Sequence, residues 1–176
     1  MELQRLEEFQ IDDRAESQIA ALLGQCFPGY PEGRAYFKQL PDFRYLCWEG
    51  GQLIAHMAVE HRMVYNDGEV FRIFGIADLC VAEAFQHRKL ASRLISELSI
   101  LGQNHRIDFL LLMAKDHGLY LNNGFELVAN DCQWLIIQEH RALGIAHRRV
   151  PSSLMVKPLG RKQWRPGFLD LLGHVF

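Results

Sequence analysis

Residues 76–98 constrain the fold of this chain more than any other stretch. An apolar segment ends near Val81, a short polar turn follows, and from about Leu90 onward apolar residues recur at helical spacing. The turn carries the sequence Gln-His-Arg-Lys at positions 86–89. Backbone amides at a helix N-terminus point outward without a partner, and the helix dipole and basic side chains add positive potential. The stretch therefore predicts a pyrophosphate site; the alternative is an ordinary strand–turn–helix whose basic turn faces water.

The bulk properties favour one folded domain without a general affinity for polyanions. A chain of 176 residues, 49% of them hydrophobic, can bury one sizeable core and is too short for two ordinary domains. Its formal net charge of −2 gives no overall attraction to nucleic acid or to an anionic membrane, so any anion site must be local. No apolar run approaches the length of a membrane span.

The cysteines and histidines favour a reduced protein without a metal. The four cysteines are widely spaced, lie in apolar surroundings and form no C-x-x-C pair, which is typical of buried free thiols in a cytoplasmic protein. The charged residues 1–9 contain no apolar core of a secretion signal. The eight histidines show no H-x-x-x-H or H-E-x-x-H spacing, so we expect no metal site.

Hydrophobic periodicity and turn formers predict a chain that mixes strands and helices. Strands are predicted over residues 3–11, 43–48, 52–65, 69–81, 107–113, 126–128 and 132–138. Helices are predicted from Asp12 or Asp13 to Gly24, with a longer buried face through Cys26 and Phe27 as the alternative, and over residues 33–40, 90–102 and 117–125. Residues 140–149 are typical of a basic excursion loop, and residues 154–156 of an extra strand. We therefore expect a single domain over residues 1–176, in which residues 140–176 form a C-terminal extension packed on it.

Two short motifs, about thirty residues apart, carry a resemblance to a known superfamily. The first is Q-H-R-K-L-A at positions 86–91, which follows the pattern Q/R-x-x-G-x-G/A except that Lys89 stands where the pattern has glycine. The second is Y-L-N-N-G-F at positions 120–125, which follows the pattern Y-x-x-x-G-F. With the predicted order of strands and helices, these motifs resemble the GCN5-related N-acetyltransferase (GNAT) superfamily.

The resemblance implies both a fold and a co-substrate. The fold class is α/β (α+β), with a central mixed, mostly antiparallel sheet of six to seven strands flanked by about four helices. The co-substrate is acetyl-CoA: the turn would cradle its pyrophosphate, and the strand before the turn would offer backbone groups to its pantetheine arm. The residues implied in coenzyme A binding are Leu79, Cys80, Val81, Gln86, His87, Arg88, Lys89, Leu90, Ala91 and Ser92.

A closer resemblance covers much of the chain. Residues 27–37 (FPGYPEGRAYF) and 55–68 (AHMAVEHRMVYNDG) are similar to segments of the aminoglycoside 2′-N-acetyltransferases. The nodulation N-acyltransferases have a similar A-H segment and a similar following strand. The aminoglycoside enzymes carry a basic residue at the position of Lys89, so the resemblance implies that this departure from glycine is a subfamily trait.

Acyl transfer to an amine needs a base for the ammonium proton and an acid for the departing thiolate. The resemblance places Tyr120 near the thioester sulfur, and a phenol with a pKa of about 10 can return a proton to a thiolate; a core tyrosine is the alternative. Asp78, on the strand that leads into the turn, and Glu60, on the neighbouring strand, are candidates for the base, and each can equally be a solvated strand residue. An acyl-cysteine on Cys80 is disfavoured because no base lies near it in sequence, and His56 is expected to be packed in its strand.

These features predict an acyl-CoA-dependent N-acetyltransferase. It would acetylate a primary amine of a small molecule by direct transfer, with an amino sugar or an aminoglycoside-like molecule as the first candidate acceptor. Two alternatives stay open: a longer-chain N-acyltransferase of the nodulation type, and a non-catalytic acyl-CoA-binding module. We expect a cytoplasmic location, no nucleic-acid or membrane partner, and a homodimer as one option.

Overall fold

The computed structural model describes residues 1–176 and contains ten strands, three α-helices and two short 3-10 helices. The strands are β1 (Glu2–Glu7), β2 (Phe43–Glu49), β3 (Gln52–Asn66), β4 (Glu69–Val81), β5 (Phe109–Met113), β6 (Glu126–Leu127), β7 (Asn130–Gln138), β8 (Arg141–Val150), β9 (Leu154–Pro158) and β10 (Phe168–His174). The helices are η1 (Glu8–Gln10), α1 (Asp13–Cys26), η2 (Glu83–Phe85), α2 (Leu90–Asn104) and α3 (Gly118–Leu121).

The chain divides into two compact units, and strands β3 and β4 and helix α2 contribute residues to both. The first unit contains Met1–Glu60 and Ala77–Leu94, and the second contains His61–Ile76 and Ile95–Phe176. The predicted mixed α+β fold class is confirmed, with more strands and fewer helices than expected. None of the helices is long and apolar enough to cross a membrane.

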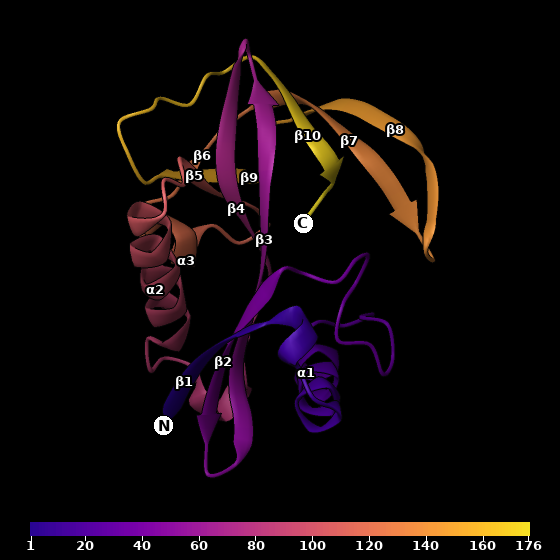
Figure 1. Cartoon of the computed structure of the whole chain (residues 1–176), viewed down its shortest axis with the longest axis vertical. Coiled ribbons are helices and arrows are strands. Elements are labelled where there is room, and N and C mark those ends of the chain that lie inside the picture. Colours follow the sequence, from indigo (N-terminus) through magenta and orange to yellow (C-terminus); the bar gives the residue numbers. More distant parts are fainter. The chain divides into compact units, whose positions relative to one another are not determined.

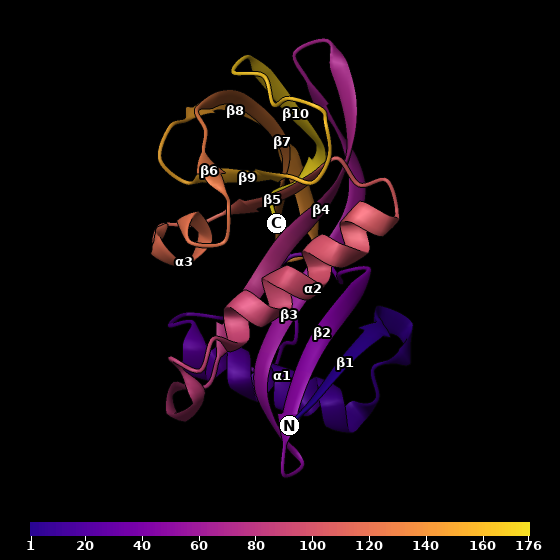
Figure 2. The same ribbon diagram turned by 90° about the vertical axis from the view of Figure 1, so that its left-hand side faces the viewer.

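Strands β1 and β2 and the first half of β3 form the antiparallel sheet of the first unit (Figure 2). β1 pairs with β2 along its whole length, and β2 continues into β3 through the turn at Gly50 and Gly51. Both glycines have positive φ, 58° and 81°, which is the conformation of a type I′ hairpin turn. The hairpin predicted from the Gly-Gly pair is confirmed.

Helix α1 packs on this sheet through one apolar face. The Asp12 carboxylate accepts a hydrogen bond from the Ala15 amide at 2.8 Å, an N-cap worth about 1 kcal/mol. The helix continues past Gly24 to Cys26, so the stop expected at Gly24 gives way to the alternative in which the apolar residues after it prolong the buried face. Cys26 packs against the same apolar cluster as the rest of the face, and this contact outweighs the roughly 1 kcal/mol that a helical glycine costs. The buried cluster consists of Ile19, Leu22, Leu23, Ala35, Leu46, Leu53, Cys80 and Ala82.

The helix predicted over residues 33–40 is absent. These residues form turns and bends, and Gly33 has a left-handed φ of 68°. The Ala35 carbonyl accepts a hydrogen bond from the Arg44 guanidinium at 2.8 Å instead of from an amide four residues ahead. The buried Arg44 side chain on β2 therefore binds a backbone carbonyl that would accept an amide hydrogen bond in a helix.

The second unit is built on a sheet with the strand order β6-β9-β5-β4-β3-β10-β7-β8. The pairs β4–β5 and β10–β7 are parallel, and the pairs β5–β9, β6–β9, β10–β3 and β7–β8 are antiparallel. β3 turns into β4 at Asp67 and Gly68, whose φ values of 45° and 94° confirm the turn predicted from the Asn-Asp-Gly sequence.

The C-terminal part of the chain supplies the additional strands. The loop predicted over residues 140–149 is wrong, because all of these residues after His140 lie in strand β8, which forms a long hairpin with β7 (Figure 1). The turn of this hairpin consists of Glu139 and His140, both left-handed, and neither residue type marks such a turn in sequence. The extra strand predicted at residues 154–156 is confirmed as β9, and β10 lies between β3 and β7.

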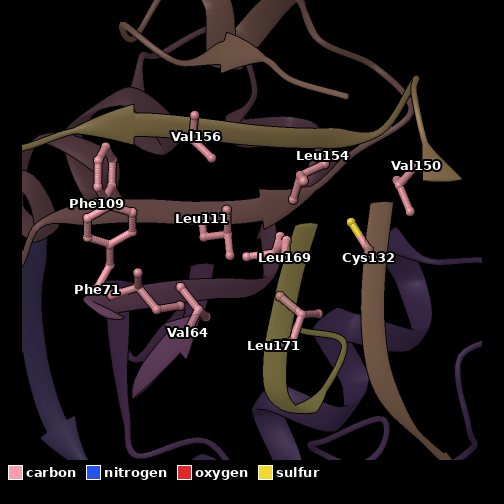
Figure 3. Close-up of a cluster of buried hydrophobic side chains, with 11 residues drawn as sticks. Val64, Phe71, Phe109, Leu111, Cys132, Val150, Leu154, Val156, Leu169 and Leu171 are labelled. Carbon is pink, nitrogen blue, oxygen red and sulfur yellow. The ribbon is translucent and has the colours of Figure 1, made fainter. Parts of the chain in front are cut away.

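An apolar cluster forms the core of the second unit (Figure 3). Phe71 and Phe109 meet edge to face with ring centroids 4.9 Å apart, and Trp164 contacts both rings. The Trp164 indole donates a hydrogen bond to the Asn130 side-chain oxygen at 2.9 Å, so its polar atom is satisfied. The cluster consists of Val64, Phe71, Ile73, Phe109, Leu111, Cys132, Val150, Leu154, Val156, Leu169 and Leu171.

Candidate active site

Asp78 interrupts the extended conformation of strand β4 in the first unit. Its φ of 52° lies in the left-handed region, within a strand that runs from Glu69 to Val81. Aspartate enters this region more readily than most residues, yet the conformation still costs about 1 kcal/mol. Irregular strand residues often re-aim a side chain next to a site. The left-handed backbone of Asp78, one of the two predicted bases, therefore aims its side chain in a direction that a regular strand residue would not take.

The Asp78 carboxylate accepts a short hydrogen bond from Tyr30. The Tyr30 phenol donates to Asp78 Oδ2 at 2.7 Å. The Tyr30 ring is held by neighbouring rings, with centroid distances of 6.1 Å to Phe27 and 5.7 Å to Phe37. Burial, and then the negative charge of Asp78, raise the pKa of Tyr30, so the phenol keeps its proton and remains the donor.

Burial raises the pKa of Asp78 above its usual range. The Tyr30 hydrogen bond and the positive charges of Arg44 and Lys38 act in the opposite direction, and Glu60 adds to the rise. A carboxylate with a raised pKa holds a proton more strongly than an ordinary aspartate does. That is the property a general base for an ammonium group requires.

His56 holds the main chain of Asp78 from the neighbouring strand β3. Its Nδ1 lies 2.9 Å from the Asp78 carbonyl oxygen, and its Nε2 lies 3.0 Å from Arg44 NH1. Arginine has no acceptor, so Nε2 must accept, and Nδ1 must carry the proton and donate. Burial lowers the pKa of His56 to about 3, and the imidazole is neutral at physiological pH. The prediction that His56 is packed rather than catalytic is consistent with this geometry.

Arg44 is a fully buried charge on strand β2. Its Nε and NH2 donate to the two carboxylate oxygens of Glu8 at 2.6 and 2.9 Å, and its NH1 donates to the Ala35 carbonyl at 2.8 Å. A bidentate pair of this kind compensates the cost of burying the charge. The chain Glu8–Arg44–His56 therefore reaches Asp78 through side chains whose directions are fixed.

The turn after β4 has the backbone of an anion site. His87 and Lys89 are exposed and left-handed, with φ of 63° and 60°, and helix α2 starts at Leu90. A left-handed residue next to a helical one turns successive amides to the same side, as in an anion-binding nest. Lys89 therefore adopts the conformation that glycine favours, at the position where the superfamily pattern has glycine.

The other polar side chains of the turn are already engaged. The Arg88 guanidinium lies over the Phe85 ring at 4.8 Å and 3.9 Å from the Glu49 carboxylate. Gln86 folds back and donates to the Val81 carbonyl at 3.3 Å. Exposed contacts of this kind are worth at most about 1 kcal/mol, so a phosphate can replace them.

Cys80 and Cys26 form a thiol pair beside the predicted pantetheine strand. Their side chains are hydrogen-bonded to each other, and the Cys26 sulfur also lies 3.7 Å from the Val81 carbonyl oxygen. The hydrogen bond with Cys26, together with burial, raises the pKa of Cys80 well above its ordinary value. The hydrogen bond with Cys80 lowers the pKa of Cys26 to about 7. Cys80 is therefore a poor thiolate, and a poor nucleophile.

Tyr120 lies in the second unit, in the short helix α3. Its ring meets Phe125 edge to face at 5.6 Å, and its carbonyl accepts a hydrogen bond from the Phe125 amide at 3.0 Å. Gly124 has a φ of 82°, which closes the turn between the two aromatic residues. Burial, and then Asp116, raise the pKa of Tyr120, so the phenol is protonated at neutral pH.

The structure brings some predicted residues together and adds others. Asp78 and Glu60 lie close enough in the first unit for Glu60 to raise the pKa of Asp78. Sequence reasoning missed Tyr30, Arg44 and Glu8. A lone arginine inside the apolar segment Phe43–Glu49 signals a buried charge that needs partners, but nothing in the sequence says which partners it finds. No sequence signal distinguishes Tyr30 from the other aromatic residues of its loop.

Comparison by sequence identifies the family. Residues 10–128, more than half of the chain, match the family described as "Acetyltransferase (GNAT) domain". The chain belongs to this family. It is therefore an acetyltransferase-type domain of the class that uses acyl-CoA. No curated protein matches its sequence.

Solved structures share the fold at low sequence identity. YhbS from Escherichia coli, crystallised with CoA, has a TM-score of 0.62 and 19% identity over 96% of this chain and 88% of that chain. Escherichia coli ElaA has a TM-score of 0.60 and 18% identity over 89% of this chain and 99% of that chain. A GCN5-related N-acetyltransferase from Anabaena variabilis has a TM-score of 0.59 and 15% identity over 73% of this chain. The present chain spans 33% of that protein's length.

Proposed function

We propose that this protein transfers an acetyl group from acetyl-CoA to a primary amine of a small molecule. The observation that supports this most is Asp78, a partly buried carboxylate of raised pKa, on the strand that leads into an anion-binding turn. A base for an ammonium group and a cradle for a pyrophosphate are two of the elements that this reaction needs. Family membership supplies the reaction class.

Asp78 accepts the proton of the substrate ammonium, and the free amine then attacks the thioester carbonyl. A carbon–nitrogen bond forms, the carbon–sulfur bond breaks, and the departing thiolate takes a proton, which is balanced by the second proton that the positively charged nitrogen loses as it becomes an amide. We assign that proton to Tyr120, an assignment that rests on the Y-L-N-N-G-F motif and on the phenol being protonated. The backbone amides after Lys89 bind the pyrophosphate, and Arg88 and Lys89 contribute charge from the side.

Two observations favour direct transfer over an acyl-cysteine. The raised pKa of Cys80 keeps its thiol protonated at neutral pH, so Cys80 is not ionised to attack the thioester. His56, the buried imidazole on the neighbouring strand, is neutral and holds its Nδ1 proton against the Asp78 carbonyl. It is therefore not available as the base of a Cys-His pair.

The charges around Asp78 favour an acceptor with few positive groups. Lys38 and Arg44 are both near enough to lower the pKa of Asp78, and Arg44 is already neutralised by Glu8. A polycationic aminoglycoside would add several positive groups beside the two positive side chains that already lower the pKa of Asp78. A monoamine or an amino sugar with a single amine fits this environment better.

The test is a thiol-release assay with acetyl-CoA and a panel of amines, with products identified by mass spectrometry. The panel contains amino sugars, aminoglycosides, polyamines and amino acids. We expect an N-acetylated product from a monoamine or amino sugar. Faster transfer from hexanoyl-CoA than from acetyl-CoA would instead identify a longer-chain acyltransferase, and coenzyme A binding without turnover would identify a binding module.

A further inference from the structure

Two side chains hold Asp78 from different directions, although neither was selected by the superfamily motifs. Tyr30, in the loop between α1 and β2, donates to the carboxylate at 2.7 Å, and His56, on β3, donates to the carbonyl at 2.9 Å. The first contact fixes the side chain and the second fixes the main chain. Together they hold Asp78 in its left-handed conformation.

We propose that Tyr30 is a positioning residue for the amine-deprotonation step: it occupies Asp78 Oδ2 and thereby presents Oδ1 to the substrate ammonium. This inference rests on the proposed function and goes beyond it, because it assigns a residue that the superfamily motifs do not contain. The Tyr30 phenol acts only through Asp78 and forms no bond to the substrate.

The surroundings of Tyr30 suit this role. Its ring packs between Phe27 and Phe37 and against the apolar cluster of the first unit, so the hydroxyl has a fixed direction. Its proton stays on the phenol because burial and the Asp78 charge oppose ionisation. A hydroxyl that cannot ionise is a constant donor over the working range of pH.

The contacts that hold the main chain of Asp78 are equally fixed. His56 Nε2 must accept from Arg44, which leaves Nδ1–H for the Asp78 carbonyl, and Arg44 is held by both oxygens of Glu8. All of Arg44 and His56 is buried, so water does not compete for these bonds. Asp78 therefore has a rigid main chain, and Tyr30 determines where its carboxylate points.

The charged and polar groups around Asp78 determine the direction in which loss of the Tyr30 hydroxyl shifts its pKa. Tyr30 from the loop, Arg44 from β2 and Lys38 from the loop lower the pKa of Asp78, and Glu60 from β3 raises it. Removal of the Tyr30 hydroxyl leaves the burial penalty and removes one stabilising bond. The carboxylate then ionises at higher pH, and since a base must be ionised to act, the acid limb of kcat/KM moves to higher pH.

The experiment compares Tyr30→Phe with Tyr65→Phe, a matched loss of a hydroxyl from an exposed ring in the second unit. The aspartate carboxyl carbons are followed by carbon-13 NMR through a pH titration of the free protein, with the Asp78 signal assigned from its absence in Asp78→Asn. In Tyr30→Phe the Asp78 midpoint is expected to rise by about one to two pH units, the equivalent of one hydrogen bond to a charged group. Tyr65→Phe is expected to leave it unchanged.

The same variants are then assayed with the amine found in the panel. The acid limb of kcat/KM is expected to shift with the NMR midpoint in Tyr30→Phe, while the KM for acetyl-CoA stays the same. An unchanged NMR midpoint overturns the inference, whatever the assay shows. A shifted midpoint with an unshifted acid limb also overturns it. If no amine is acetylated, the proposed function fails, but the titration still tests the contact between Tyr30 and Asp78.

If the Tyr30→Phe variant does not fold, a second measurement on wild-type protein tests the same inference. Wild-type protein labelled with 3-fluorotyrosine has more acidic phenols, which donate stronger hydrogen bonds. The Asp78 midpoint is then expected to fall, and a midpoint that stays constant contradicts the inference.

Discussion

At the residue scale, the buried imidazole of His56 makes the protein sensitive to acid. Its pKa is lowered to about 3 in the folded state and is about 6.5 in the unfolded chain. The folded state therefore favours the neutral imidazole. The contribution of this neutral form to the free energy of unfolding is complete above pH of about 6.5 and is lost as the pH falls toward about 3. The loss is at most ~1.4 kcal/mol per pH unit, and the raised pKa of Asp78 offsets part of it.

We therefore predict a free energy of unfolding that falls between pH of about 6.5 and about 3 in urea titrations, the window being set by these pKa values. His56→Asn removes the titrating group and retains a donor near the position of Nδ1. It is expected to be less stable than wild type at pH 7 and to lose less stability on acidification. A parallel pH dependence in the two proteins would show that His56 is not the group responsible.

Tyr120 is the second residue with a role that can be tested alone. Tyr120→Phe removes the predicted acid and is expected to lower kcat by about 10²–10⁴-fold, with the dissociation constant of coenzyme A unchanged by calorimetry. Because the pKa of Tyr120 is raised, activity of the wild type should persist to the ordinary phenol pKa or above it. Equal losses in turnover and affinity would reject the role of Tyr120 as the acid.

At the element scale, the turn between β4 and α2 combines a left-handed lysine with a helix start. Lys89→Gly and Lys89→Ala remove the same charge, but only glycine relieves the cost of a φ of 60°. Lys89→Gly is expected to be more stable than Lys89→Ala by about 1 kcal/mol in chemical denaturation. Both should bind coenzyme A more weakly than wild type, with the larger difference at low salt.

An alanine variant as stable as the glycine variant would contradict the left-handed conformation of Lys89. Unchanged affinity of both variants for coenzyme A would argue against the turn as the pyrophosphate site. The two outcomes are independent, because the first concerns the backbone and the second concerns the charge.

The same scale shows what the sequence can predict. Hairpins with Gly-Gly and Asn-Asp-Gly turns, the capped start of α1, and strand β4 with its turn follow from local chemistry, and all are observed. The β7–β8 hairpin turns at Glu139 and His140, which carry no turn signal. The helix expected over residues 33–40 is displaced by a long-range bond from Arg44 to Ala35. Local patterns do not contain such contacts.

The residues of the candidate site likewise divide into those that local sequence predicts and those that only long-range contacts reveal. Asp78, Glu60 and the turn at residues 86–91 were predicted from strand position and motif. Tyr30 contacts Asp78 across 48 residues of sequence, Arg44 contacts His56 across 12, and Glu8 contacts Arg44 across 36. Their pairing depends on how α1, β1 and β2 pack on one another, and it becomes visible only in three dimensions.

At the scale of the whole molecule, we propose acyl transfer for a chain whose first unit contains both the Asp78 carboxylate, held by Tyr30, and the left-handed turn before α2. In this proposal Asp78 is the base. Asp78→Asn keeps the shape of the side chain and an oxygen that can accept from Tyr30, and removes the basicity. Glu60→Gln is the matched control on the neighbouring strand.

The most direct test is the initial rate of thiol release from acetyl-CoA with the acceptor found in the amine panel, measured for wild type, Asp78→Asn and Glu60→Gln. We predict that Asp78→Asn lowers kcat/KM for the amine by about 10²–10⁴-fold, with coenzyme A affinity preserved and Glu60→Gln close to wild type. Turnover of Asp78→Asn at the wild-type rate would contradict it.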